Sequence, residues 1–172
     1  MIKTASFNLK QYLYKNSPII LLFITVLTEI DLNYSAIEYL SFNFSYILIF
    51  YYSLKKSESL GYGLIFIAGL FNDVVLGMPI GISSLSYLLI CGFAAYLRNI
   101  TLRPNLIKDW IFFLITISVV NSLLYTVLTL MFLFKIDYFY FVTNTMFTFF
   151  LYLLFSYVFY FYETKITGRF YA

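Results

Sequence analysis

Histidine is absent from the 172-residue sequence, and cysteine occurs only once, as Cys91. Without histidine the chain cannot form histidine-based nucleophilic triads, and the usual zinc clusters are excluded as well. A single cysteine forms no internal disulfide, so Cys91 is interpreted as a small buried apolar residue. The glycine-rich motifs that hold nucleotide phosphates are missing, and the basic segments are too short and scattered for a nucleic-acid site. We therefore expect neither an enzyme nor a bound metal or cofactor.

Charge is also scarce: charged residues make up 11% of the chain, whereas 62% of it is hydrophobic. This composition is typical of a membrane protein and not of a soluble domain. Because a spanning helix needs roughly 20 mostly apolar residues, the length allows about six spans and leaves no room for a separate soluble domain. We expect one all-α integral membrane domain over residues 1–172, embedded in the lipid bilayer.

Apolar runs give the expected bounds of the six transmembrane helices. The second, third and fourth runs are short, because a helix of roughly 16 residues reaches only about 24 Å, less than the ~30 Å hydrocarbon core. Neighbouring helices or local thinning of the bilayer must make up the difference. The runs cover approximately residues 12–30, 39–54, 60–76, 80–97, 108–134 and 138–162.

Basic residues indicate the orientation of these spans. With six spans, ten of the eleven basic residues fall on one side of the membrane, and only Lys135 falls on the other. Loops rich in lysine and arginine stay in the cytoplasm, so both termini are expected there. The cytoplasmic set consists of Lys3, Lys10, Lys15, Lys55, Lys56, Arg98, Arg103, Lys108, Lys165 and Arg169.

One acidic residue lies inside an apolar stretch. In GLFNDVVLGMPIGISSLSYLL, residues 69–89, Asp73 is followed by Gly77, Pro79 and Gly81. A carboxylate at membrane depth is costly unless it is paired, capped or hydrated. We expect a helix that ends at Asp73, a tight turn, and a new helix that starts at Pro79 and holds the carboxylate with its free backbone amides. Contact with a protein partner, and proton or ion chemistry, are the alternative roles of Asp73.

Small and polar residues recur at helical spacing in four of the spans. Gly69 shares a helix face with Asp73, where a glycine lets a neighbouring backbone come close. Helix packing is favoured over a substrate-lined cavity as the role of these stripes. The four stripes are Gly61, Ala68, Gly69 and Asn72; Gly81, Ser84, Cys91 and Ala95; Ser118, Ser122, Tyr125 and Thr129; and Thr145, Thr148, Tyr152 and Ser156.

The segment from Gly69 to Asn99 resembles the most recognisable part of the bacterial rod shape-determining protein MreD family. That pattern is Gly-x-x-x-Asp, then Gly-x-x-x-Gly, then a helix with an aromatic and basic end. Length, six spans and cytoplasmic ends also agree with the family over the whole chain. The structural or partner-contact motif that the resemblance carries over is Gly69, Asp73, Gly77, Pro79 and Gly81, with Tyr96 and Arg98 at the end of the following helix.

The resemblance implies a non-enzymatic scaffold of the cell-elongation complex in the bacterial inner membrane. Members are taken to bind the bitopic protein MreC and to link MreB filaments to a RodA-type glycosyltransferase and its penicillin-binding transpeptidase partner. The implied fold is similar to the substrate-binding subunits of energy-coupling-factor vitamin transporters. A small-molecule-binding subunit of a vitamin-type transporter is therefore the alternative function, which the polar stripes also motivate.

Overall fold

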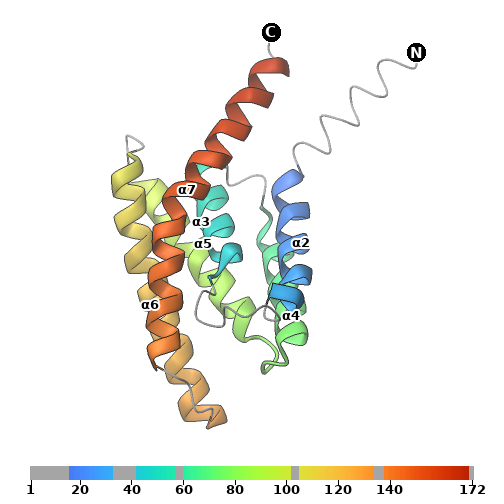
Figure 1. Ribbon diagram of the computed structural model, residues 1–172, viewed down its shortest axis with the longest axis vertical. Coiled ribbons are helices and arrows are strands. Elements are labelled where there is room, and N and C mark those ends of the chain that lie inside the picture. Colours follow the sequence, from blue (N-terminus) through green and yellow to red (C-terminus); the bar gives the residue numbers. More distant parts are fainter. Residues whose placement is uncertain (1–15, 33–41, 57–59, 102–104, 134–137, 171–172) are drawn as a thin grey trace, which may run out of the picture.

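The chain folds as an all-helical bundle, as the composition predicts. The computed structural model describes residues 16–32, 42–56, 60–101, 105–133 and 138–170, and these form six helices (Figure 1). Their bounds are α2, Ser17–Leu32; α3, Phe44–Lys55; α4, Tyr62–Leu76; α5, Ile82–Ile100; α6, Leu106–Phe132; and α7, Tyr138–Phe170.

The helices differ from the expected spans mainly at their ends. α5 begins at Ile82 and continues to Ile100, slightly later at both ends than the expected 80–97. α7 continues to Phe170, past the expected limit at Tyr162, because the sequence beyond it is less apolar but still compatible with a helix. Residues 12–15 and 39–41, the starts of the first two expected spans, lie outside the described residues.

Two helices of the described chain are long and apolar enough to cross a membrane. They are α6, Leu106–Phe132, and the first 27 residues of α7, Tyr138–Thr164. Ser17–Thr28 in α2 and Tyr62–Leu76 in α4 are apolar but shorter. The bundle thus combines short and long apolar helices.

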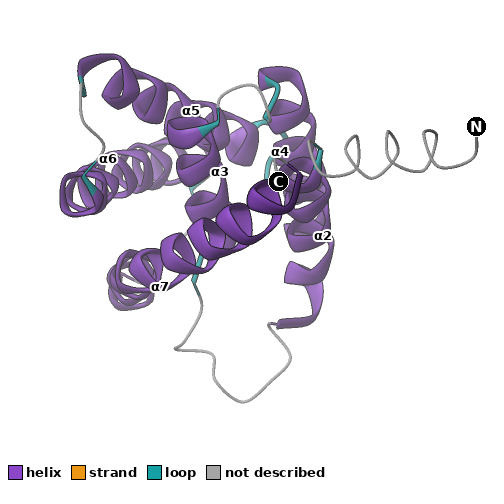
Figure 2. Ribbon diagram, turned by 90° about the horizontal axis from the view of Figure 1, so that it is seen from above, coloured by secondary structure: helices purple, strands orange, loops and turns teal. Residues whose placement is uncertain are grey.

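α3 is the central helix of the bundle. Every residue from Ser45 to Leu54 is buried, although a surface helix normally buries only one face. α3 contacts α2, α5 and α7, and Figure 2 shows it enclosed among these helices. The ring of Phe50 lies 5.0 Å from that of Phe113 and 5.7 Å from that of Tyr152, so α6 and α7 both pack against it.

Polar side chains gather inside the bundle, and large apolar side chains cover much of its outside. Exposed apolar residues follow α4, α6 and α7 along their length, including Val74, Leu130 and Phe139. This distribution is the reverse of what water favours and suits a surface in contact with lipid. The buried polar and charged residues are Ser45, Ser53, Asn72, Asp73, Ser84, Ser86, Asp109, Thr116, Asn121, Thr148 and Ser156.

α4 and α5 approach each other backbone to backbone at Gly69. A Cβ atom added there would lie 2.4 Å from Cα and 2.6 Å from N of Ser84. The Ser84 hydroxyl donates a hydrogen bond of 3.0 Å to the carbonyl of Phe66, one turn before Gly69. Close packing at small residues and hydrogen bonds between helices both favour helix association in lipid.

Replacement of Gly69 by alanine should therefore destabilise the bundle. The new methyl group would push apart two backbones that cannot rotate away, and overpacking of this kind costs about 1–3 kcal/mol or more. Gly92→Ala on α5 is the matched control, because a Cβ there meets nothing within 4 Å. Alanine should stabilise that helical position by roughly 0.5–1 kcal/mol. Thermal unfolding in detergent micelles measures both, and equal midpoints for the two variants would contradict the prediction.

Candidate functional site at the turn between α4 and α5

The carboxylate of Asp73 is held by the backbone amides at the start of α5. Oδ2 accepts a hydrogen bond of 2.6 Å from N of Gly81, and Oδ1 accepts one of 2.8 Å from N of Ser83. The residue has no solvent-exposed surface. Both oxygens are thus engaged by N–H groups at the positive end of a helix, the arrangement expected from the sequence.

Asp73 takes the place of the side chain that usually caps a helix start. The residue at the N-cap position of α5 is Gly81, which has no side chain to accept a hydrogen bond. Its φ of 104° lies in the left-handed region, where glycine is strongly favoured over other residues. A residue from the preceding helix therefore provides the cap, and the connection between α4 and α5 is fixed by it.

The turn itself begins later than the sequence suggested. α4 does not end at Asp73 but continues to Leu76, and Gly77 follows with a φ of 63°. N of Met78 donates to the carbonyl of Asp73 at 2.9 Å, and N of Gly77 donates to that of Val74 at 3.4 Å. These two bonds form a Schellman motif, which needs a left-handed residue, so the helix stops at the first glycine that can supply it.

Pro79 also differs from its expected position. It was expected in the first turn of the following helix, but α5 begins at Ile82 and Pro79 precedes the N-cap residue. Its carbonyl accepts a hydrogen bond of 3.4 Å from N of Ile82. Pro79 therefore belongs to the turn, because the left-handed conformation of Gly81 interrupts the chain before the helix can start.

Asn72 adds a second polar link between the two helices. Its Nδ2 donates to Oγ of Ser83 at 3.0 Å, and the side chain is almost fully buried. The structure thus brings Gly69, Asp73, Gly77, Pro79 and Gly81 together on a single helical hairpin. Chemically, the hairpin satisfies an acid inside an apolar bundle and fixes the angle between α4 and α5.

The polar stripes expected on the other helices have different outcomes. On α7, Thr148, Tyr152 and Ser156 are buried, and Oγ1 of Thr148 accepts from N of Asn43 at 3.0 Å. On α6, Ser118 and Ser122 of the expected stripe are exposed, whereas Tyr125 and Thr129 are partly buried. The buried polar residues of α6 are instead Asp109, Thr116 and Asn121.

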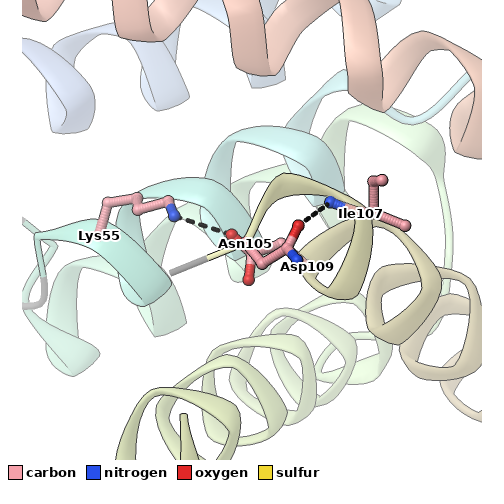
Figure 3. Close-up of polar contacts among 4 residues, drawn as sticks. All are labelled: Lys55, Asn105, Ile107 and Asp109. Carbon is pink, nitrogen blue, oxygen red and sulfur yellow. Dashed lines mark hydrogen bonds and ion pairs between the residues drawn. The ribbon is translucent and has the colours of Figure 1, made fainter. Parts of the chain in front are cut away.

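Sequence reasoning missed an ion pair at the opposite end of the bundle. Nζ of Lys55, at the end of α3, lies 2.8 Å from Oδ2 of Asp109 in the first turn of α6 (Figure 3). The Asp109 side chain is only 4% exposed. Oδ1 of Asn105 caps α6 by accepting from N of Ile107 at 3.1 Å. The signal in the sequence was Asp109, an acidic residue four positions after the capping Asn105. Lys55 had served only as evidence for the orientation of the spans.

Two further contacts attach the same end of α3 to α5 and α7. Nη1 of Arg98 donates to the carbonyl of Ser53 at 2.9 Å. Nζ of Lys56 lies 3.3 Å from Oε1 of Glu163. We call these contacts together the charged clasp; its residues are Ser53, Lys55, Lys56, Arg98, Asp109 and Glu163.

Substitutions of Asp73 should distinguish the contribution of its charge to stability from that of its size and shape. Asp73→Ala removes two charge-assisted hydrogen bonds of about 1.5–3 kcal/mol each, so we expect a loss of about 3 kcal/mol or more in unfolding free energy. Asp73→Asn retains one acceptor and should be intermediate. Ser83→Ala is the control, because it keeps both amide donors and removes only the bond from Asn72. Denaturation in mixed micelles gives the values, and an alanine variant as stable as Ser83→Ala would refute the cap.

The ion pair of the charged clasp makes a second prediction. Lys55→Met leaves Asp109 buried without its partner, which should cost about 3–5 kcal/mol. The double variant Lys55→Met/Asp109→Leu should recover most of that loss, since no charge is then left buried. Lys56→Met, at the neighbouring but half-exposed lysine, should change stability by less than about 1 kcal/mol. A double variant as unstable as Lys55→Met in the same unfolding assay would show that the pair is not coupled.

Comparison with known proteins gives a family match for this chain. A family model described as rod shape-determining protein MreD matches residues 10–167. Searches of curated proteins and of solved structures give no match. The family match extends over most of the chain, well beyond the Gly69–Asn99 segment from which the resemblance was drawn, and it confirms that resemblance. The chain therefore belongs to the rod shape-determining protein MreD family.

Proposed function

We propose that the protein is a non-enzymatic, six-span scaffold of the cell-elongation machinery in the bacterial inner membrane. The observation that carries the proposal is the family match over residues 10–167, which supports a role in rod shape determination. The interior of the bundle is consistent with a scaffold, because the two buried acids of the described residues, Asp73 and Asp109, are engaged in holding helices together. Such groups stabilise a fixed arrangement of helices that other proteins can recognise.

The proposed orientation has both termini in the cytoplasm. Lys55, Arg98 and Asp109 come from three helices but meet in the charged clasp, and Lys108 directly precedes Asp109 in the first turn of α6. A concentration of basic groups at one end favours the cytoplasmic side. The turn between α4 and α5, with Asp73, then lies at the periplasmic end.

The partners that we propose follow from family membership. An MreC-type bitopic protein is the direct partner, and through it the bundle helps to couple MreB filaments to the RodA-type glycosyltransferase and the penicillin-binding transpeptidase. Exposed apolar residues along α4, α6 and α7 provide surface for lipid and for a partner's transmembrane helix.

A small-molecule-binding subunit is the second candidate. It is favoured by a polar group between the start of α3 and α7, where Nδ2 of Asn43 donates to Oδ1 of Asn144 at 3.1 Å. Nearby on α6 and α7, Nδ2 of Asn121 donates to Oγ1 of Thr145 at 2.9 Å. These groups bind one another, whereas a ligand site needs donors and acceptors directed at the ligand. A small molecule that copurifies from native membranes would favour this candidate.

Deletion of the gene tests the scaffold proposal in cells. Rods should become round, and a tagged wild-type copy should restore the rods and copurify an MreC-type protein. The Asp73→Ala variant should restore shape less well than Gly92→Ala, because it loosens the α4–α5 hairpin, provided that both are compared at equal membrane abundance. Rods of normal width after deletion, measured by microscopy together with the sites of new wall synthesis, would refute the proposal.

A further inference from the structure

The charged clasp sets a common level for three helices. Lys55 of α3 contacts Asp109 of α6 at 2.8 Å, and Arg98 of α5 donates to the carbonyl of Ser53 on α3 at 2.9 Å. The ends of the three helices therefore lie at about the same height in the bundle. Lys56 beside them is half exposed, and Lys108 is exposed. Charged groups at this level belong at the headgroup boundary of the membrane. Heights along the other helices can therefore be counted from the clasp.

Counted in this way, the two sides of the bundle have different heights. α5 from Arg98 back to Ile82 rises about 24 Å, whereas α6 from Asp109 to Phe132 rises about 35 Å. With α5 along the bilayer normal, α6 would need a tilt of about 45° from that normal to remove the difference, more than the range of about 0–40° for spanning helices. In Figure 1, where α6 begins at the upper end, its lower end extends beyond the turn between α4 and α5.

The difference puts the α4–α5 turn below the outer surface of an undisturbed bilayer. The hydrocarbon core is about 30 Å thick, so a turn at about 24 Å would be surrounded by acyl chains. The last carbonyls of α4, at Val75 and Leu76, have no intrahelical donor, and Gly77 is exposed. Each unsatisfied backbone group in hydrocarbon costs several kcal/mol. Bending of the bilayer costs only fractions of a kcal/mol per Å.

We propose that the protein depresses the outer leaflet of the bilayer around the α4–α5 turn. Phospholipid headgroups and water reach the backbone of residues 77–81 there, while the same height on α6 stays in hydrocarbon. The long α6 holds the leaflet at its normal height on its side. This inference rests on the six-span orientation proposed above but not on any protein partner. In this inference, the side of the bundle with the short α4 and α5 is a surface that deforms the lipid bilayer.

Three cysteine variants test the depression in purified protein. Ile80→Cys lies on the turn, where Ile80 is 75% exposed, and Thr126→Cys lies on the exposed face of α6 at about the same height, about 25 Å from Asp109. Leu133→Cys, at an 85% exposed position after the end of α6, is the accessible control. All three are made in a Cys91→Ser background, which keeps the acceptor for the hydroxyl of Ser53. The proteins are placed in vesicles of dioleoyl phosphatidylcholine and treated with a membrane-impermeant maleimide.

The expected rates of reaction with the maleimide test the leaflet depression separately from the six-span orientation. Ile80→Cys should react nearly as fast as Leu133→Cys, and Thr126→Cys at least about tenfold more slowly, because a polar reagent does not enter hydrocarbon. Slow reaction of both Ile80→Cys and Thr126→Cys, or fast reaction of both, overturns the depression. In spheroplasts, where the reagent reaches only the outer face, Ile80→Cys and Leu133→Cys should both react. If Ile80→Cys reacts fast in vesicles but only one of the two variants reacts in spheroplasts, the six-span orientation fails, whereas the partner proposal is tested separately by copurification.

Discussion

The bond between the Asp73 carboxylate and the first amides of α5 is the interaction on which the bundle depends. It fixes the connection between α4 and α5, and the backbone contact of Gly69 with Ser84 then sets the distance between the two helices. α5 in turn packs against α3 and α6, and α4 packs against α2. An acid that would be costly alone in lipid thus fixes a hairpin that packs against α2, α3 and α6.

The two ends of the bundle use polar groups in different ways. At the turn, a single charge is satisfied by backbone dipoles, and no second charge is required. At the charged clasp, side chains of opposite sign join α3 to α6 and α7, and Arg98 joins it to α5. Because hydrophobic attraction does not hold helices together in lipid, these contacts and the small residues between the helices supply the cohesion. The membrane role of the family is consistent with this division between interior and exterior.

Local features of the fold could be predicted from the sequence, and distant contacts could not. Asp73 and the amides that hold it lie within ten residues, so helix-end chemistry was sufficient to connect them. Lys55 and Asp109 are 54 positions apart, and no sequence pattern near either residue predicts that it pairs with the other. Ser118 and Ser122 of the α6 stripe lie outside because a hydroxyl group does not by itself require burial against another helix: Oγ1 of Thr126 bonds to the carbonyl of Ser122 in its own helix. An amide such as Asn121 is the better marker, because it bonds to another helix.

The burial of α3 also bears on how the chain enters the membrane. A helix of 12 residues is about 18 Å long, too short to cross the hydrocarbon core alone, and it has no face for lipid. Its surroundings include α7, which the ribosome makes after α2 to α6. α3 therefore reaches its final environment only after α7 has been synthesised. Insertion of this protein is thus a concerted late step around α3, and a chain truncated before α7 leaves its most buried helix uncovered.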